Sequence, residues 1–298
     1  QQLFYLGQDS LFAKFFTAQS NKLEDIVFQL FRVIGEKLEL TDKYDPLVSD
    51  SDFARGLGIK YPVFQGPMAN VSDSTSFAKN VADHGALPFL GLGGLPKNQV
   101  KKLMESAQKK LTNYGVGLIG TETLQDMYES HVSCIAPYKP PYAIIAGGNH
   151  NQARKLENIG ISTFLHTPST HLLQTALEHE IFQVILEGTE AGGHVGSLTS
   201  FVLWEMGMNL IDTNYASRIS QIKLVFAGGI SCNTASRFIT GCTASLAKKG
   251  LKTGISVGTA YLFTREIIKN KAVEKNYQNL ALQQRHTLTI GNTVSLTT

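Results

Sequence analysis

A carboxylate, an imidazole and closely spaced glycines lie together in the run Glu187-Gly-Thr-Glu-Ala-Gly-Gly-His-Val-Gly196. The run directly follows the apolar stretch 181–186, which predicts a strand that ends at Glu187 and opens into a loop around His194. Glycine weakens helices and strands and is useful where φ must be positive or where backbone must approach a ligand. We therefore expect Gly192, Gly193 and Gly196 to bring backbone close to a ligand rather than to serve packing.

Glu187 and His194 carry the chemistry of this run. A carboxylate at a strand end can accept hydrogen bonds from ribityl or ribose hydroxyls, and an imidazole can donate a hydrogen bond or transfer a proton near pH 7. The structural alternatives are an internal salt bridge for Glu187 and hydrogen bonds to backbone carbonyls for His194. Within a glycine loop we favour function for both. His150 and His166 also follow predicted strands, where packing and function remain equally open.

Two later loops have the composition of a phosphate site. Ala227-Gly-Gly-Ile230 and Val257-Gly-Thr259 each follow an apolar run. Glycine lets backbone N–H groups approach an anion, and a helix N-terminus next to such a loop favours negative charge. We expect Gly228, Gly229, Gly258 and Thr259 to bind a phosphate together, although each motif alone is also typical of a tight turn. The lysine signature of a P-loop is not present.

The elements that position these residues alternate regularly from about residue 62 onward. Short apolar runs, read as strands, alternate with stretches of helical spacing, which is typical of repeated βα units around a parallel sheet. This rhythm predicts an α/β fold, a TIM (β/α)8 barrel rather than an open doubly wound sheet, with glycine-rich loops meeting at the carboxyl ends of its strands. The expected strands are Pro62–Phe64, Ala86–Leu90, Tyr114–Ile119, Tyr142–Ala146, Ser162–His166, Phe182–Glu187, Lys223–Ala227 and Gly254–Val257.

The first part of the chain does not follow this rhythm. Residues 23–40 have the spacing of an amphipathic helix, and residues 45–52 have the composition of a turn-rich linker. We therefore predict an N-terminal helical extension and linker over residues 1–57, followed by the barrel over residues 58–298. The chain begins at Gln1 without a methionine, which agrees with a segment excised from a longer polypeptide.

Bulk composition excludes several classes of function. A formal charge of +3 without a dense basic run argues against nucleic-acid binding. No apolar segment approaches the ~20 residues of a membrane span, and the N-terminus lacks the pattern of a secretion signal. Cys134, Cys232 and Cys242 are odd in number and lack metal spacing, which is typical of free thiols in a reducing compartment. We expect a cytoplasmic protein that binds no metal.

Four motifs together resemble the nitronate monooxygenase family, formerly called 2-nitropropane dioxygenases, which includes flavin-dependent enoyl reductases of bacterial fatty-acid synthesis. The resemblance covers about residues 58–268 and implies a TIM barrel that binds FMN. It implies that Gly66, Pro67, Met68, Glu187, Gly192, Gly193, Gly228, Gly229, Gly258 and Thr259 contact the cofactor and that His194 is the catalytic residue. The motifs are Gln65-Gly-Pro-Met-Ala-Asn-Val-Ser-Asp73, the run 187–196, Ala227-Gly-Gly-Ile230 and Gly258-Thr259.

One position departs from the family, and other segments suggest a sub-class. The family often has an asparagine that contacts the flavin at the position of Gly117, so this contact is absent here. The overall pattern is similar to nitronate-monooxygenase-like domains within type I polyketide synthases. That similarity rests on Leu6-Gly-Gln-Asp-Ser10, Ala86-Leu-Pro-Phe-Leu90, Ala146-Gly-Gly148 and Phe201-Val-Leu-Trp204.

Three functional hypotheses follow from the resemblance. The first is an FMN-dependent enoyl reductase-like domain of a polyketide or fatty-acid synthase, which reduces α,β-unsaturated thioesters with NAD(P)H. Its substrate would be a small molecule or an acyl group bound to a carrier protein, and its partners other domains of a megasynthase. The second is a nitronate monooxygenase that uses O2. The third is a non-catalytic structural or docking barrel, which the glycine at position 117 keeps open. No G-x-G-x-x-G dinucleotide fingerprint is visible, and a transient NAD(P)H donor does not require one.

Overall fold

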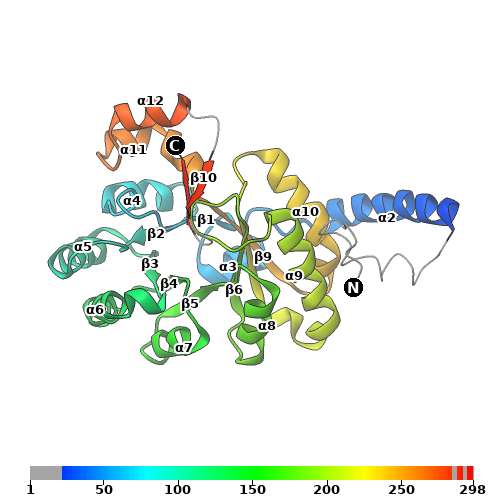
Figure 1. Cartoon of the computed structure of the whole chain (residues 1–298), viewed down its shortest axis with the longest axis horizontal. Helices are drawn as coiled ribbons and strands as arrows, with labels where there is room; N and C mark the ends of the chain where they lie inside the picture. Colours follow the sequence, from blue (N-terminus) through cyan, green and yellow to red (C-terminus); the bar gives the residue numbers. More distant parts are fainter. Residues whose placement is uncertain (1–21, 284–286, 291–293, 298) are drawn as a thin grey trace, which may run out of the picture.

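The structure is a computed structural model that describes residues 22–283, 287–290 and 294–297. Eight parallel strands close into a barrel in the order β1-β2-β3-β4-β5-β6-β8-β9 (Figure 1). Each strand of the barrel pairs with its neighbours along the chain, and β9 closes the ring against β1. The strands are β1 (Val63–Gln65), β2 (Leu87–Gly91), β3 (Gly115–Ile119), β4 (Tyr142–Ala146), β5 (Ser162–His166), β6 (Gln183–Glu187), β8 (Lys223–Ala227) and β9 (Lys252–Val257).

The predicted TIM barrel is thereby confirmed, because each strand expected from the apolar runs is a strand of the barrel. Helices surround the barrel on its outer side (Figure 1). They are α4 (Thr75–Asp83), α5 (Lys97–Lys110), η2 (Glu122–Leu124), α6 (Gln125–Ile135), α7 (His150–Asn158), α8 (Thr170–Glu178), α9 (Ser200–Asn214), η3 (Ala216–Gln221), α10 (Asn233–Lys248), η4 (Thr259–Phe263), α11 (Arg265–Lys269) and α12 (Lys275–Gln283).

Aromatic side chains fill the interior of the barrel, and a short helix closes its floor. Phe64, Phe89 and Phe164 are fully buried, with Phe64 centred 5.0 Å from each of the other two rings. The helix α3 (Asp52–Leu57) inserts Phe53 next to them, 5.6 Å from Phe64. A side-chain carbon on Gly254 of β9 would come within 2.5 Å of the Phe53 ring, so only glycine fits there. The predicted boundary at residue 57 stays a prediction, but α3 packs with the barrel.

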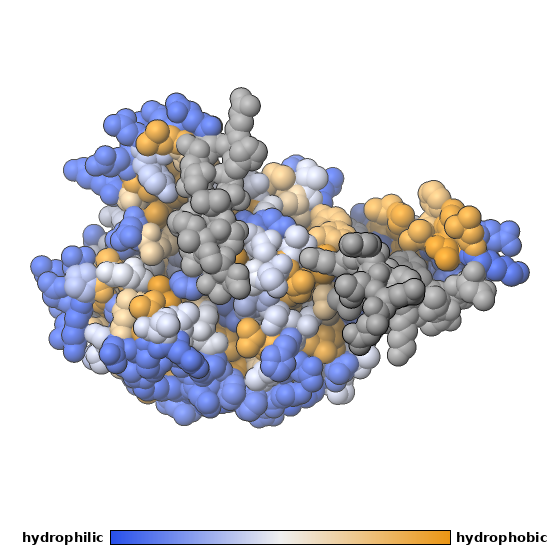
Figure 2. Space-filling view, in the orientation of Figure 1, coloured by the Kyte–Doolittle hydropathy of each residue, from blue (hydrophilic) through white to orange (hydrophobic). Residues whose placement is uncertain are grey.

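A long helix stands beside the barrel. The helix α2 (Leu23–Lys43) includes the predicted helix 23–40 and lies against α10, where Lys37 Nζ donates to Ser245 Oγ at 2.7 Å. No residue of α2 is buried, and its apolar side chains form much of the hydrophobic surface on that arm of the molecule (Figure 2). The expected motif Leu6-Gly-Gln-Asp-Ser10 lies outside the described residues.

A second, small sheet involves the histidine loop. The two-residue strand β7 (Gly193–His194) pairs antiparallel with β11 (Val294–Thr297), which in turn pairs with β10 (Thr287–Ile290). In register, His194 faces Val294 and Gly193 faces Ser295. The backbone of the predicted catalytic loop is therefore part of a sheet with the C-terminal strands, a pairing of segments about a hundred residues apart that local sequence patterns do not reveal.

Candidate active site at the carboxyl ends of the strands

The residues predicted to act all follow the carboxyl ends of barrel strands. Gly66, Pro67 and Met68 follow β1, Glu187 ends β6, and the loop with His194 begins directly after it. The pairs Gly228-Gly229 and Gly258-Thr259 follow the adjacent strands β8 and β9. The fold thus gathers these segments at one mouth of the barrel, the face on which such barrels place their active sites.

The turn after β1 is held by its own hydrogen bonds. Gly66 N donates to Val257 O at 3.0 Å, which ties the turn to β9. Met68 N donates to Ser72 Oγ at 2.8 Å, and Met68 O accepts from the backbone of Val71 and Ser72. The N–H of Met68 is therefore not free for a ligand. Its sulfur lies 3.8 Å from the position of a side-chain carbon on Gly258, so the Met68 side chain reaches across to the loop after β9.

The turn Gly66–Met68 also explains why residue 117 of β3 is a glycine. A side-chain carbon on Gly117 would lie 2.1 Å from Pro67 Cβ and 2.6 Å from Pro67 Cγ. Similarly, a side-chain carbon on Gly91 of β2 would lie 2.6 Å from Met68 O. The turn Gly66–Met68 thus packs onto the ends of β2 and β3, and the glycine that departs from the family pattern makes room for it.

The glycines of the loop 187–196 divide into two kinds. A side-chain carbon on Gly192 or Gly193 would meet no atom within 4 Å among the described residues, and Gly193 has a φ of 104°. By contrast, a side-chain carbon on Gly196 would lie 2.3 Å from Pro168 O, and one on Gly188 would lie 2.3 Å from Ser200 N. The expectation that none of these glycines serves packing is therefore wrong for Gly196, whose backbone lies against the loop after β5. Gly192 and Gly193 border open space, as a ligand-facing loop requires.

A carboxylate within the same loop anchors it to a helix. Glu190 Oε2 accepts hydrogen bonds from Ser200 N at 2.7 Å and from Ser200 Oγ at 2.5 Å. Ser200 is the first residue of α9, so Glu190 satisfies a backbone N–H at the start of that helix and places its negative charge where the helix dipole favours it. The loop between β6 and α9 is thereby fixed at its middle as well as at its ends. The contact between Glu190 and Ser200 was not predicted from the sequence. The only signal for it was a carboxylate in the loop that precedes the start of α9.

The loop after β8 presents backbone donors. Gly228 and Gly229 both have positive φ, at 103° and 69°. Gly228 is buried against Ser200, and Gly229 is exposed. The 16-residue helix α10 begins four residues later, with no acidic residue in its first turn. The first-turn N–H groups of Thr234 and Ala235 point to the thiol of Cys232, which is only a weak acceptor, and the positive end of the helix dipole at this point suits a phosphate.

Thr259 and Gly258 complete the same side of the mouth. Thr259 is exposed and begins η4, directly after β9. Because β8 and β9 are neighbours in the barrel, the two glycine loops lie side by side. The donor set of this side, which consists of backbone N–H groups, one hydroxyl and no basic side chain in the predicted motifs, matches a phosphate bound by backbone rather than by a lysine.

His166 and Glu187, at the ends of the neighbouring strands β5 and β6, lie in contact. His166 Nδ1 is 2.5 Å from Glu187 Oε2, and both side chains are about nine-tenths buried, with 11% and 9% exposed. The sequence left His166 open between packing and function, and its partner is the carboxylate that the sequence assigned to the cofactor. A histidine at the end of the strand before a carboxylate-ended strand was the signal that would have paired them.

His150 has a packing role in the structure. Its ring stacks on that of His179 at 3.6 Å between centroids. Burial and the neighbouring His179 both lower the pKa of His150.

Within the described residues, no group of three or more histidine, cysteine, aspartate or glutamate side chains is arranged to hold a metal ion. No helix within those residues is long and apolar enough to cross a membrane.

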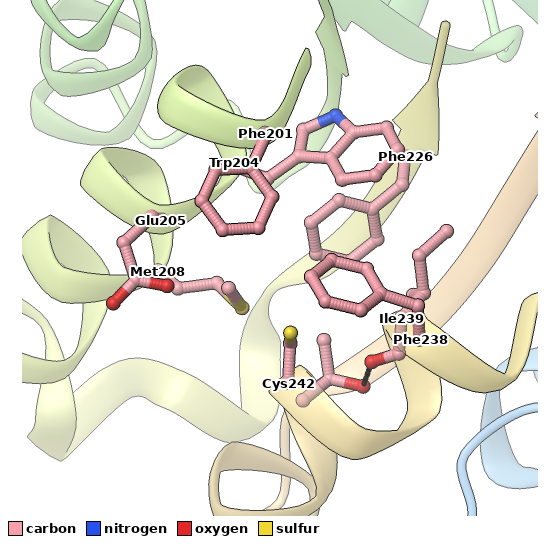
Figure 3. A pocket seen from close by; sticks show the side chains of 9 residues that line it. Phe201, Trp204, Glu205, Met208, Phe226, Phe238, Ile239 and Cys242 are labelled. Atoms are coloured by element: carbon pink, nitrogen blue, oxygen red, sulfur yellow. Dashed lines mark hydrogen bonds between the residues drawn. The ribbon is translucent and has the colours of Figure 1, made fainter. Parts of the chain in front are cut away.

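The thiols differ in their surroundings. Cys232 is exposed at the N-terminus of α10, where hydrogen bonds from the backbone of Ala235 and Thr234 lower its pKa. Cys242 lies in a small apolar hollow between α9 and α10, on the outer side of the barrel (Figure 3), and burial raises its pKa to about 11. Trp204, in the wall of that hollow, donates from Nε1 to Leu186 O at 3.2 Å and so supports the end of β6.

Comparison with solved structures shows which known folds this chain is similar to. No protein-family model matches the sequence, and no curated protein sequence matches it. FabK from Thermotoga maritima is similar with a TM-score of 0.66 and 23% identity, over 82% of this chain and 73% of FabK. A nitroalkane oxidase from Streptomyces ansochromogenes gives a TM-score of 0.63 and 18% identity, over 81% of this chain and 78% of its own. The enoyl reductase domain of MlnA, from the macrolactin biosynthesis cluster of Bacillus amyloliquefaciens, gives a TM-score of 0.61 and 14% identity, over 83% of this chain and 66% of the MlnA domain. These similarities establish a shared barrel fold.

Proposed function

We propose that the chain is an FMN-dependent oxidoreductase, an enoyl reductase-like domain that reduces α,β-unsaturated thioesters with NAD(P)H. The observation that carries the proposal is that Gly192 and Gly193 border open space among the described residues, in a loop that follows a carboxylate-ended strand. Two further glycine loops follow the adjacent strands β8 and β9, at the same mouth of the barrel. The motifs that resemble the nitronate monooxygenase family lie at this same mouth. The shared barrel fold with FabK and with an enoyl reductase domain supports the assignment.

Each segment of the mouth has a task under this proposal. Gly228, Gly229, Gly258 and Thr259 would hold the phosphate of FMN. Glu187 would accept hydrogen bonds from the hydroxylated chain of the cofactor, since a carboxylate is an acceptor only. Gly192 and Gly193 would let backbone lie against the ring on one side. Pro67 and the Met68 side chain, which reaches toward Gly258, would contact the flavin ring on another side.

When bound, FMN supplies hydride transfer, from NAD(P)H to the β-carbon of the unsaturated thioester. The part left to the protein is to orient the substrate and to bring a proton to the α-carbon. His194 is suited to this, because its backbone is held in β7 by the pairing with β11 while its side chain stays partly exposed. An imidazole can donate a hydrogen bond or a proton near pH 7.

A carrier-bound substrate and a megasynthase context belong to the same proposal. The similarity to the enoyl reductase domain of MlnA, from a macrolactin biosynthesis cluster, supports a megasynthase context. In that context we propose an acyl group on a carrier protein as the substrate. The second candidate is a nitronate monooxygenase, which the likeness to a nitroalkane oxidase favours. In that reading His194 would orient or deprotonate the nitro compound. A third candidate, a non-catalytic barrel, loses its main support, because Pro67 fills the space over Gly117 without closing the space beside Gly192.

Anaerobic half-reactions distinguish these candidates. The FMN-loaded protein would be reduced with NADH or NADPH and then mixed in a stopped-flow instrument with a crotonyl thioester, an alkyl nitronate or O2. We expect the crotonyl thioester to reoxidise the flavin fastest. Faster reoxidation by O2 in the presence of nitronate would favour the second candidate. A protein that does not take up FMN would contradict both enzymatic candidates.

A further inference from the structure

The helix α2 contacts the rest of the protein through polar side chains. Lys37 Nζ donates to Ser245 Oγ of α10 at 2.7 Å. A side-chain carbon on Gly241 of α10 would lie 3.8 Å from Thr41 Oγ1, so the two helices also come close there. An amphipathic helix on a globular protein normally packs its apolar stripe against the core. In α2 no residue is buried, so its apolar stripe is not used in this way.

The apolar side chains of α2 form a stripe on one side of the helix, which we call the outer face. Its central residues follow one another at intervals of four, three and four, the spacing of a coiled-coil seam. The central residues are Val27, Phe31, Ile34 and Leu38, and the flanking residues are Leu23, Phe28 and Leu30. All seven are between 46% and 79% exposed. Figure 2 shows hydrophobic side chains gathered on this arm of the molecule.

The size and charge of the outer face favour a protein partner. Large apolar side chains have about 150–250 Å² of surface each, so these exposed fractions leave several hundred Å² of apolar area. This is of the order of the ~800 Å² that each partner buries in a standard protein–protein interface. A helix that lies on a membrane is typically rich in lysine and arginine. In contrast, α2 carries five acidic and three basic side chains, which disfavours a lipid surface.

The spacing of the outer face is self-complementary. The intervals of four, three and four residues read the same in both directions along the helix. A second α2 that runs antiparallel therefore sets Phe31 against Ile34 of the other copy. The same arrangement sets Val27 against Leu38 of the other copy. Each contact occurs twice, as in the two-fold symmetric interfaces of homodimers.

We propose that the outer face of α2 is a homodimer interface, in which two copies of this chain pair through antiparallel α2 helices. Glu24 lies in the first turn of α2 and Lys43 in its last turn, so antiparallel copies bring opposite charges together at both ends. Each barrel contacts the C-terminal half of its own α2, at Lys37, and the N-terminal half projects as an arm (Figure 1). The two barrels would therefore lie at opposite ends of the helix pair. This inference concerns assembly and does not depend on the proposed function.

Sedimentation velocity of the full chain at micromolar concentrations tests the dimer. The wild type would be compared with Phe31→Asp, which places a charge at the centre of the interface, and with Leu282→Asp. The second variant is the matched control, because Leu282 of α12 is also a strongly exposed apolar residue, at 64%. We expect the wild type and Leu282→Asp to form dimers. In Phe31→Asp the dimer should dissociate at least about a hundredfold more readily, because each interface would bury two aspartates.

Two outcomes of this comparison would overturn the inference. One is a wild-type protein that is monomeric at every concentration, including one that instead floats with phosphatidylcholine vesicles, which would assign the outer face to lipid. The other is an equal loss of the dimer in Phe31→Asp and Leu282→Asp.

Cross-linking tests the orientation of the helices and still decides if Phe31→Asp does not fold. Val27→Cys and Leu38→Cys would each be made in a Cys232→Ser background, which lacks the exposed native thiol. The two variants would be oxidised separately and as a mixture, and covalent dimers measured on a non-reducing gel. Antiparallel pairing predicts covalent dimers from the mixture and at least about tenfold fewer from either variant alone, because each position faces the other one. Covalent dimers from Val27→Cys alone, as many as from the mixture, would overturn the antiparallel pairing.

Discussion

Pro67 occupies the space above Gly117, with its Cβ 2.1 Å from where a side-chain carbon at Gly117 would lie. An asparagine at this position, frequent in the family that the motifs resemble, therefore has no room while the turn after β1 keeps its place. The glycine at position 117 and the position of the turn after β1 therefore depend on each other, because Pro67 occupies the space that a side chain at position 117 would need. Gly117 thus reflects packing between β3 and the turn and says nothing against a ligand at the mouth.

Substituting Gly117 should destabilise the fold. A methyl group there forces Pro67 to move, and overpacking of this kind typically costs about 1–3 kcal/mol of the free energy of unfolding. Urea unfolding of Gly117→Ala against the wild type measures this. The double variant Pro67→Gly/Gly117→Ala should recover part of the loss, because Pro67→Gly removes the carbons that clash. A Gly117→Ala variant as stable as the wild type would contradict the packing explanation.

Gly192→Ala should show the opposite behaviour. In the part of the chain that the structure describes, a side-chain carbon there meets nothing within 4 Å, so the free energy of unfolding should change by less than about 0.5 kcal/mol. The methyl group enters the space proposed for the flavin, so FMN affinity should fall about tenfold. Titration of FMN fluorescence measures this. Gly56→Ala, at another open glycine in the helix on the barrel floor, is the matched control and should leave FMN affinity unchanged. Equal FMN affinity in Gly192→Ala and the wild type would place the flavin elsewhere.

The contrast between these glycines shows what sequence patterns can and cannot predict. The strands were predictable, because buried strands of a parallel barrel are short apolar runs, and the loops between Glu187 and Thr259 were recognisable as glycine-rich strand ends. The spacing did not reveal which glycines border a ligand, because Gly192 and Gly196 differ only in what lies opposite them. Side-chain contacts across strands, such as His166 with Glu187, depend on the register of the sheet. The pairing of His194 with Val294 depends on a distant segment.

His194→Ala should separate chemistry from cofactor binding. We expect the variant to keep FMN, because the cofactor contacts proposed for this loop belong to the backbone of Gly192 and Gly193 rather than to the imidazole. Turnover should fall about a hundredfold or more, the usual contribution of a general acid. Steady-state reduction of a crotonyl thioester with NADPH, alongside the flavin absorbance of the purified protein, checks both. His171→Ala, at an exposed histidine of α8, is the control. Unchanged turnover in His194→Ala would remove the imidazole from its assigned role.

Glu190→Ala should loosen the glycine loop. The carboxylate holds Ser200 N and Oγ, and loss of a helix N-terminal cap typically costs about 1 kcal/mol of the free energy of unfolding. Amide hydrogen exchange should rise at the start of α9 and in the loop after β6, and remain unchanged in β2. Glu39→Gln, an exposed carboxylate on α2, serves as the control. Exchange in the loop no faster than in the wild type would show that Glu190 is not its anchor.

Alkylation of Cys232 should report on the phosphate loop. Backbone hydrogen bonds lower its pKa, whereas burial raises the pKa of Cys242 to about 11. A lower pKa gives more thiolate at a given pH, so iodoacetamide should modify Cys232 at a pH where Cys242 is still protonated. A phosphate at the start of α10 should slow this reaction, so excess FMN should protect Cys232 more than riboflavin does. Mass spectrometry of the labelled peptides measures both thiols. Equal rates at Cys232 with FMN and with riboflavin would contradict a phosphate at this helix.

Binding of FMN at the glycine-lined mouth can be measured by calorimetric titration of the wild-type protein, with Gly192→Ala and Gly56→Ala titrated in parallel. We expect one FMN bound per chain by the wild type and by Gly56→Ala, with weaker binding by Gly192→Ala. A wild-type protein that binds no FMN, or a Gly192→Ala variant that binds it as tightly as the wild type, would show that the mouth is not an FMN site.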